Sequence, residues 1–114
     1  MVVRNLTRQT ILADKAVAAD TSAKRRTGLL KHQTLPEGEG LWIVPCEGVH
    51  TFAMKFAIDV LFLGKDRKVL KIRKNMVQRR ISFCLRAHSV LEVPVGMVER
   101  TKTEVGDQLE LIKE

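Results

Sequence analysis

The sequence is poor in aromatic residues, in cysteine and in long apolar segments. Its 114 residues include four phenylalanines, one tryptophan and no tyrosine, so few rings are available to stack on nucleic-acid bases. The two cysteines, Cys46 and Cys84, can form one disulfide at most, and we expect them to be reduced thiols of a cytoplasmic protein. No apolar run approaches the roughly 20 residues of a membrane-spanning helix, and the first residues lack the apolar core of a signal peptide. We therefore expect neither a disulfide-built scaffold nor a membrane partner.

Motifs for the common cofactors are missing as well. The sequence contains no Walker loop, no glycine-rich dinucleotide fingerprint, no zinc-finger spacing and no serine elbow. Its glycines are scattered among expected turns. The sequence therefore leaves the cofactor unknown.

The composition suffices for one hydrophobic core. Hydrophobic residues make up 45% of the chain, and the mean hydropathy is -0.06. A domain of this size buries roughly 65% of the surface that its unfolded chain exposes. We expect residues 1–114 to form a single domain.

Short apolar segments between turn residues predict a mainly β fold. The expected strands cover residues 2–5, 10–13, 41–44, 49–55, 58–63, 68–73, 81–85, 90–95 and 108–112. One short helix is expected over residues 21–31, because Asp20, Thr21 and Ser22 provide N-cap side chains. This number of strands is typical of a compact antiparallel sandwich or closed barrel.

The basic residues are unevenly distributed. The formal net charge is +7, and residues 65–86 hold nine Lys or Arg against one acid, while residues 87–114 hold six acids against three bases. This asymmetry predicts a polyanion-binding patch, whose candidate members are Lys24, Arg25, Arg26, Lys71, Arg73, Arg79 and Arg80. However, Trp42, Phe52 and Phe62 lie in apolar strand patterns that are typical of a core, which weakens the case for nucleic acid.

Three polar residues occur in apolar strand patterns. Alternation along one expected strand places His50, Phe52 and Met54 on one face, which we expect to be buried. Asp59 and Glu92 each lie between apolar neighbours, although an isolated buried charge is very costly. In one interpretation, Asp59 accepts hydrogen bonds from backbone amides and Glu92 pairs with an arginine. In the other, both carboxylates share a cleft with His50 and serve as acid, base or ligand.

Two Cys-x-x-x-His pairs, Cys46/His50 and Cys84/His88, contain residue types that bind zinc. Residues four apart on an extended strand lie about 13 Å from one another, too far to share an ion. We therefore predict no zinc site formed by these four residues and assign no metal ligand, while a metal held by His50 with other partners stays an alternative. A related hypothesis makes Cys46 a nucleophile with His50 as its base.

Several motifs together are similar to one prokaryotic protein family. They are Gly28-Leu29-Leu30 and residues 40–43, 45–56, 58–63, 90–96 and 105–107. Through them the chain, from about Ala13 to Leu111, resembles the family called domain of unknown function 192. The resemblance implies a compact all-β sandwich of jelly-roll kind with one short helix, and it implies no activity.

The resemblance also bears on the candidate site. The positions that match the family's motifs are Cys46, His50, Met54, Asp59, Glu92 and Gly96, which implies a shared pocket without naming its ligand. Ala57 stands where family members often carry proline. Cys84 and His88 match no motif of the family.

Three functions follow as alternatives. The preferred one is a non-catalytic domain that binds a small molecule in a pocket formed by His50, Met54, Asp59, Glu92 and Cys46. The second is a small hydrolase or metal-dependent enzyme that uses His50 with Asp59 or Glu92. The third is a module that binds nucleic acid or another polyanion through the basic patch.

Overall fold

The structure, a computed structural model, describes residues 1–30 and 32–113. Its elements in chain order are β1 (Val2–Asn5), β2 (Thr10–Ala13), β3 (Lys15–Ala19), α1 (Ser22–Thr27), β4 (Glu39–Ile43), β5 (Gly48–His50), β6 (Ile58–Leu63), β7 (Val69–Met76), β8 (Ile81–Phe83), β9 (Ser89–Pro94), α2 (Met97–Arg100) and β10 (Leu109–Ile112). The predicted mainly β fold is confirmed. Neither described helix has the length or the apolar character that crossing a membrane requires.

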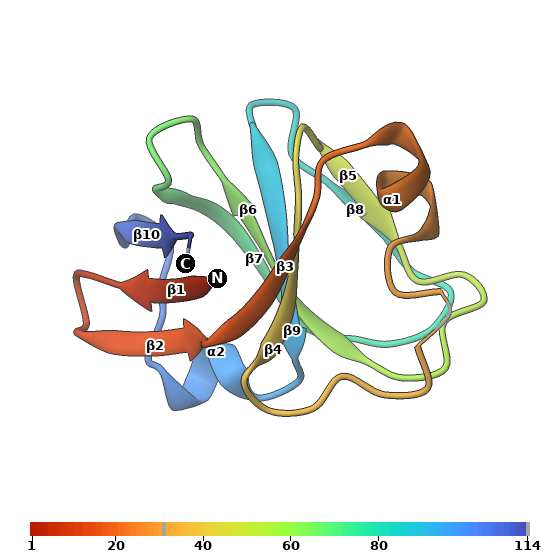
Figure 1. Cartoon of the computed structure of the whole chain (residues 1–114), viewed down its shortest axis with the longest axis horizontal. Helices are drawn as coiled ribbons and strands as arrows, with labels where there is room; N and C mark the ends of the chain where they lie inside the picture. Colours follow the sequence, from red (N-terminus) through yellow and green to blue (C-terminus); the bar gives the residue numbers. More distant parts are fainter. Residues whose placement is uncertain (31, 114) are drawn as a thin grey trace.

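A five-stranded sheet forms the centre of the molecule, in the order β3-β4-β9-β6-β7. The three-stranded sheet β10-β1-β2 lies on one side of it, while α1 and the two-stranded β5–β8 ribbon lie on the other (Figure 1). Most paired strands are antiparallel, but β3 and β4 run parallel. The central sheet is therefore mixed rather than purely antiparallel.

The central strands β6 and β9 are buried on both faces. All six side chains of β6 are buried, as expected for an unbroken apolar run between turns. Side chains alternate across the sheet, so Leu61 and Leu63 pack in one core cluster with the terminal strands. Val60 and Phe62 pack in a second cluster beneath α1 and β5. The two clusters lie on opposite faces of one sheet.

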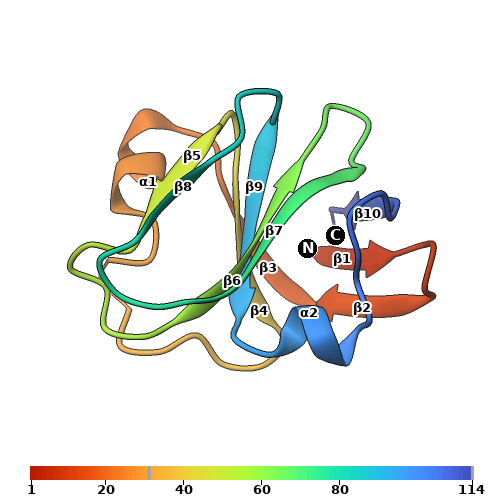
Figure 2. The same ribbon diagram turned by 180° about the vertical axis from the view of Figure 1, so that it is seen from behind.

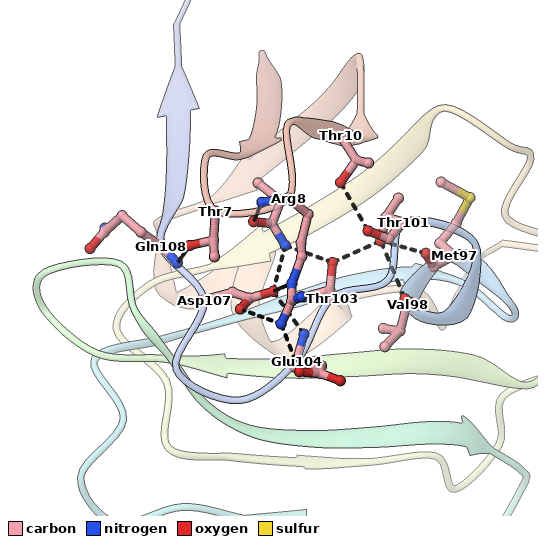
Figure 3. Close-up of polar contacts among 11 residues, drawn as sticks. Thr7, Arg8, Thr10, Met97, Val98, Thr101, Thr103, Glu104, Asp107 and Gln108 are labelled. Atoms are coloured by element: carbon pink, nitrogen blue, oxygen red, sulfur yellow. Dashed lines mark hydrogen bonds and ion pairs between the residues drawn. The ribbon is translucent and has the colours of Figure 1, made fainter.

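A buried polar network joins the two ends of the chain (Figure 3). One Asp107 carboxylate oxygen accepts hydrogen bonds from Asn5 Nδ2 at 3.0 Å, Arg8 Nε at 3.0 Å and the Glu104 backbone N–H at 2.9 Å. Asn5 Nδ2 also donates to Thr103 Oγ1. Burial by itself raises the pKa of Asp107, but these hydrogen bonds outweigh it and hold the pKa below its usual value. The network fastens β1 to the loop before β10.

The predicted helix is shorter in the structure. It ends at Thr27, because Gly28 adopts a left-handed φ of 48° and its N–H caps the Lys24 carbonyl. Its predicted last residue, Lys31, lies outside the described residues. The short helix α2 was not predicted, and neither was strand β3, whose three alanines favour no strand and which pairs with β4 only in the folded chain.

The predicted strand over residues 49–55 was largely wrong. Strand β5 ends at His50, and the chain then turns, with Ala53 at a φ of 64°. The expected buried face of alternating residues does not form: His50 and Phe52 are exposed, while Thr51 and Met54 are buried. Thr51 Oγ1 donates to the Val77 carbonyl at 2.5 Å, which holds this turn against the loop after β7.

Replacing Asp107 by alanine should destabilise the protein by about 2–4 kcal/mol, because Asn5 and Arg8 then lose a buried acceptor. The free energy of unfolding in urea measures the effect. Glu104→Ala serves as the control: Glu104 also pairs with Arg8, but its side chain is 71% exposed, so its loss should cost less than about 1 kcal/mol. Equal losses for the two variants would contradict this assignment.

Candidate functional site

A cavity of about 440 Å³ lies between α1, β5 and the central sheet. It is bordered by α1 and the turn after it, by β4, by the segment that enters β5, and by β9; its lining residues are 22, 25–30, 43, 45–46, 48–50, 54 and 92. Figure 1 shows α1 and β5 side by side at the end of the molecule opposite the β10-β1-β2 sheet, and Figure 2 shows the same arrangement from behind.

The cavity has apolar walls and a polar entrance. Leu29, Ile43, Val49 and Met54 belong to the second core cluster and are buried. The α1 residues that line the cavity are polar, and none of the helix's residues is buried. A concave apolar site with a few polar groups is the usual form of a small-molecule site.

Glu92 is the buried ionisable group of this cavity. It lies in β9 opposite Val60, so its side chain points to the same face as that of Val60, beneath α1. Its exposed fraction is 4%, and burial raises its pKa from 4.5 to about 7. Within residues 1–30 and 32–113, its carboxyl makes no hydrogen bond and no ion pair; the expected arginine partner is absent from this part of the chain.

Asp59 lies on the other face of the sheet. It pairs with Val93 in β9, one position from Glu92, and alternation therefore directs the two carboxylates in opposite directions. Its oxygens accept backbone N–H groups of Asn75 at 2.8 Å, Gly96 at 3.0 Å and Val98 at 3.1 Å. The expectation that Asp59 shares a cleft with Glu92 and His50 was wrong. Asp59 instead holds the start of α2 and the end of β7 against β6.

Cys46 and His50 both line the cavity but are not coupled as a nucleophile and its base. The Cys46 thiol donates to the Gly48 carbonyl, with Sγ and O 3.0 Å apart, and burial raises its pKa. His50 is exposed, and its ring lies beside that of Phe52, tilted by 37° with the ring centroids 5.7 Å apart. A neutral thiol bonded to a carbonyl is a poor nucleophile.

Arg25 lines the cavity, although the sequence did not predict it as part of this site. Its guanidinium donates to the carbonyls of Asp20 and Val44 and to Ser22 Oγ, at 3.2–3.3 Å. These partners are neutral, so they orient the guanidinium without cancelling its charge. Arg25 and Arg26 were predicted only as members of a polyanion patch, because nothing in the sequence shows that α1 covers the face of the sheet that carries Glu92.

The remaining predicted patch residues lie on other elements. Lys71 and Arg73 belong to β7, and Arg79 and Arg80 to the loop before β8. Lys71 Nζ donates to the Phe83 carbonyl at 2.8 Å. The predicted patch is therefore divided between α1, β7 and the loop before β8.

The described residues contain no group of three or more His, Cys, Asp or Glu side chains that could hold a metal ion. The two Cys-x-x-x-His pairs do approach one another through their backbones, because the Cys46 N–H donates to the His88 carbonyl. Cys46 and Cys84 are free thiols. This backbone hydrogen bond connects the segment before β5 to the segment before β9.

The sequence profile of DUF192, described as uncharacterized ACR, matches residues 3–111. The chain belongs to the DUF192 family. It is 28% identical to a UPF0127 protein of Thermococcus sibiricus over 111 residues, which is 93% of this chain and 71% of that protein. It is 32% identical to a UPF0127 protein of Pyrococcus furiosus over 97 residues, covering 81% of this chain and 82% of that protein.

A solved structure has the same fold. It is the crystal structure of a protein of unknown function from Novosphingobium aromaticivorans, with a TM-score of 0.83 and 24% sequence identity, covering 96% of this chain and 82% of that chain. The family and this structure bring no established activity to the chain.

Replacing Asp59 by alanine should destabilise the protein by more than about 3 kcal/mol, because it leaves three backbone N–H groups without their charged acceptor. Chemical denaturation measures the loss. Asp66, an exposed aspartate whose carboxylate accepts one backbone N–H, from Lys68, provides the matched control: Asp66→Ala should cost about 1 kcal/mol or less. A small effect of Asp59→Ala would mean that these contacts do not hold α2.

Glu92 should make stability fall as the pH rises from about 4.5 to about 7. In this range the folded protein keeps the proton on Glu92 while the unfolded chain releases it, so the stabilisation is complete below 4.5 and lost by about 7. The change amounts to something on the order of 3 kcal/mol. Glu92→Gln should remove this component, so that its melting temperature exceeds that of the wild type increasingly between pH 5 and 8. Glu99→Gln, at an exposed position, should follow the wild-type curve.

Proposed function

We propose that this protein is a non-catalytic domain that binds a small dipolar molecule in the cavity beneath α1. One observation carries the proposal: the cavity contains Glu92, a nearly buried carboxyl that has no hydrogen-bond partner among the described residues. An unpartnered buried polar group is costly. A ligand that donates a hydrogen bond to Glu92 offsets this cost.

The rest of the lining defines the chemistry of the ligand. The walls that Leu29, Val49 and Met54 provide suit an apolar middle portion. At the α1 side, Arg25 and Arg26 suit a carboxylate or a phosphate, since guanidinium groups bind both in a bidentate manner. A volume of about 440 Å³ lies within the usual range of small-molecule sites. The ligand thus carries a hydroxyl, amide or amine at one end and an anion at the other.

An enzymatic function is the second candidate, and it now depends on Glu92. A carboxyl with a pKa of about 7 is suited to general acid–base catalysis near neutral pH. The partners considered for it are less suitable, because Asp59 lies on the opposite face and Cys46 lacks a base.

A cytoplasmic location is also part of the proposal, and the two free thiols support it.

Native mass spectrometry of freshly purified protein tests the binding function. We expect the wild type to carry a small-molecule mass that Glu92→Leu and Thr27→Trp lose, because the first removes the buried acceptor and the second fills the cavity at its α1 side. Thr34→Trp is the control: Thr34 is exposed and does not line the cavity, so this variant should keep the added mass.

The single thiol of a Cys84→Ser variant provides a second readout. Cys46 then reports on the cavity through its rate of alkylation by iodoacetamide, which should fall severalfold when the co-purified molecule is added back. A bare chain mass together with an unchanged alkylation rate in the presence of the small-molecule fraction of a cell extract would contradict the proposal. Turnover of the bound molecule would instead support the enzymatic alternative.

A further inference from the structure

The outer side of the β5–β8 ribbon exposes a row of large apolar side chains. Ile81, Phe83 and Leu85 are 58%, 59% and 77% exposed. The residues between them, Ser82 and Cys84, face inward and are buried or partly buried. Over Ile81–Phe83 the alternation is that of a strand with one face on the core, except that here the outward face is apolar; Leu85 lies in the turn that follows β8. We call the side chains of Ile81, Phe83 and Leu85 the outer ribbon face.

No described part of the chain covers this face. The ribbon lies at the end of the molecule opposite the β10-β1-β2 sheet in both views (Figures 1 and 2). Across the ribbon, Gly48 pairs with Phe83 and the exposed His50 pairs with Ile81, so the side chain that β5 places beside the row is the imidazole of His50. Val17 and Val105 are as exposed, but each occurs singly, which is common on protein surfaces.

Positive charge flanks the outer ribbon face at both ends. Arg79 and Arg80 directly precede Ile81, and Arg86 directly follows Leu85; residues 79–86 contain no acid. All three arginines are exposed, and none forms a salt bridge with a described residue. The acid across the ribbon is Glu47, whose carbonyl accepts the Cys84 N–H and whose side chain is exposed. The charged side chains around the outer ribbon face therefore carry a net positive charge.

We infer that the outer ribbon face docks on an anionic lipid surface. This departs from the expectation that no membrane partner exists, which rested on the lack of a membrane-spanning segment; docking at the surface requires no such segment. Ile81, Phe83 and Leu85 enter the boundary between headgroups and acyl chains, where burial of their apolar area is favourable. Arg79, Arg80 and Arg86 stay at the level of the lipid phosphates and attract them. An anionic bilayer matches this combination of exposed apolar side chains and flanking arginines, because its apolar interior lies beneath a layer of negatively charged headgroups.

Two other occupants fit less well. A second copy of this chain would bring its own Arg79, Arg80 and Arg86 against the same arginines, and like charges oppose such a contact. A single-stranded nucleic acid needs aromatic faces for stacking, and although Phe52 and Phe83 are exposed, the most exposed member of the row is the aliphatic Leu85. Leucine and isoleucine provide no stacking face, but they do insert into lipid.

Flotation with vesicles tests this inference on the full chain. The wild type should float with vesicles of phosphatidylglycerol mixed with phosphatidylcholine and remain unbound with phosphatidylcholine alone. Binding should weaken as salt is added, because the ions screen the arginines. Failure to bind the anionic vesicles at low salt would overturn the inference. So would binding to a single-stranded oligonucleotide that displaces the protein from the vesicles, since the face would then belong to nucleic acid.

Two independent variants separate the apolar and the charged contributions. Phe83→Ser with Leu85→Ser, and Arg79→Glu with Arg80→Glu, should each lower the partition coefficient by roughly tenfold or more. The controls are Val105→Ser, which removes an equally exposed apolar side chain elsewhere, and Arg4→Glu with Lys15→Glu, which makes the same change in net charge at exposed positions. Equal losses in the controls would overturn the inference.

The result of the vesicle-binding experiment does not depend on whether the cavity binds a small molecule. Glu92→Gln alters the cavity and leaves the outer ribbon face intact, so it should bind vesicles as the wild type does. Circular dichroism of each variant shows that it is folded; because the side chains substituted on the outer ribbon face and in its controls are exposed, the melting temperatures of those variants should change little. Loss of vesicle binding in Glu92→Gln would contradict the assignment of docking to the outer ribbon face.

Discussion

The antiparallel pairing of β6 with β9 is the constraint on which the rest of the structure depends. Both strands are buried on both faces, and each carries one carboxylate whose residue is less than 5% exposed. The register of the pair sends Asp59 to one face and Glu92 to the other. On the first face, backbone N–H groups of β7 and of the start of α2 meet Asp59. On the second, Glu92 meets a cavity.

The cavity exists because α1 and β5 cover the sheet without filling the space above Glu92. The helix ends after six residues at Gly28, and β5 has three residues before the chain turns. Arg25 is held over the cavity by carbonyl and hydroxyl groups that leave its charge uncompensated. A buried acid and an oriented guanidinium on the same apolar cavity thus define a dipolar site, and the two proposals use opposite sides of the β5–β8 ribbon.

Prediction from the sequence was most accurate for elements whose position depends only on the residues within them. The apolar run of β6, the turn that follows it and the N-cap of α1 all lie where the pattern predicted them. The candidate site was predicted in part: Cys46, His50, Met54 and Glu92 line one cavity, whereas Asp59 does not. The error at Asp59 came from reading two strands separately, since only their register shows which side chains share a face. Phe52 was expected in the core because a strand was assumed to continue past His50.

The sequence by itself determined the mainly β character, most strand positions and the unusual presence of carboxylates in apolar strands, because these depend on alternation and turn residues within short segments. Tertiary structure alone decided the parallel β3–β4 pair, the opposite directions of Asp59 and Glu92, and the position of Arg25 over the cavity. It also decided that Phe83 and Leu85 remain exposed. These features depend on which distant segments meet, and local patterns carry no record of that.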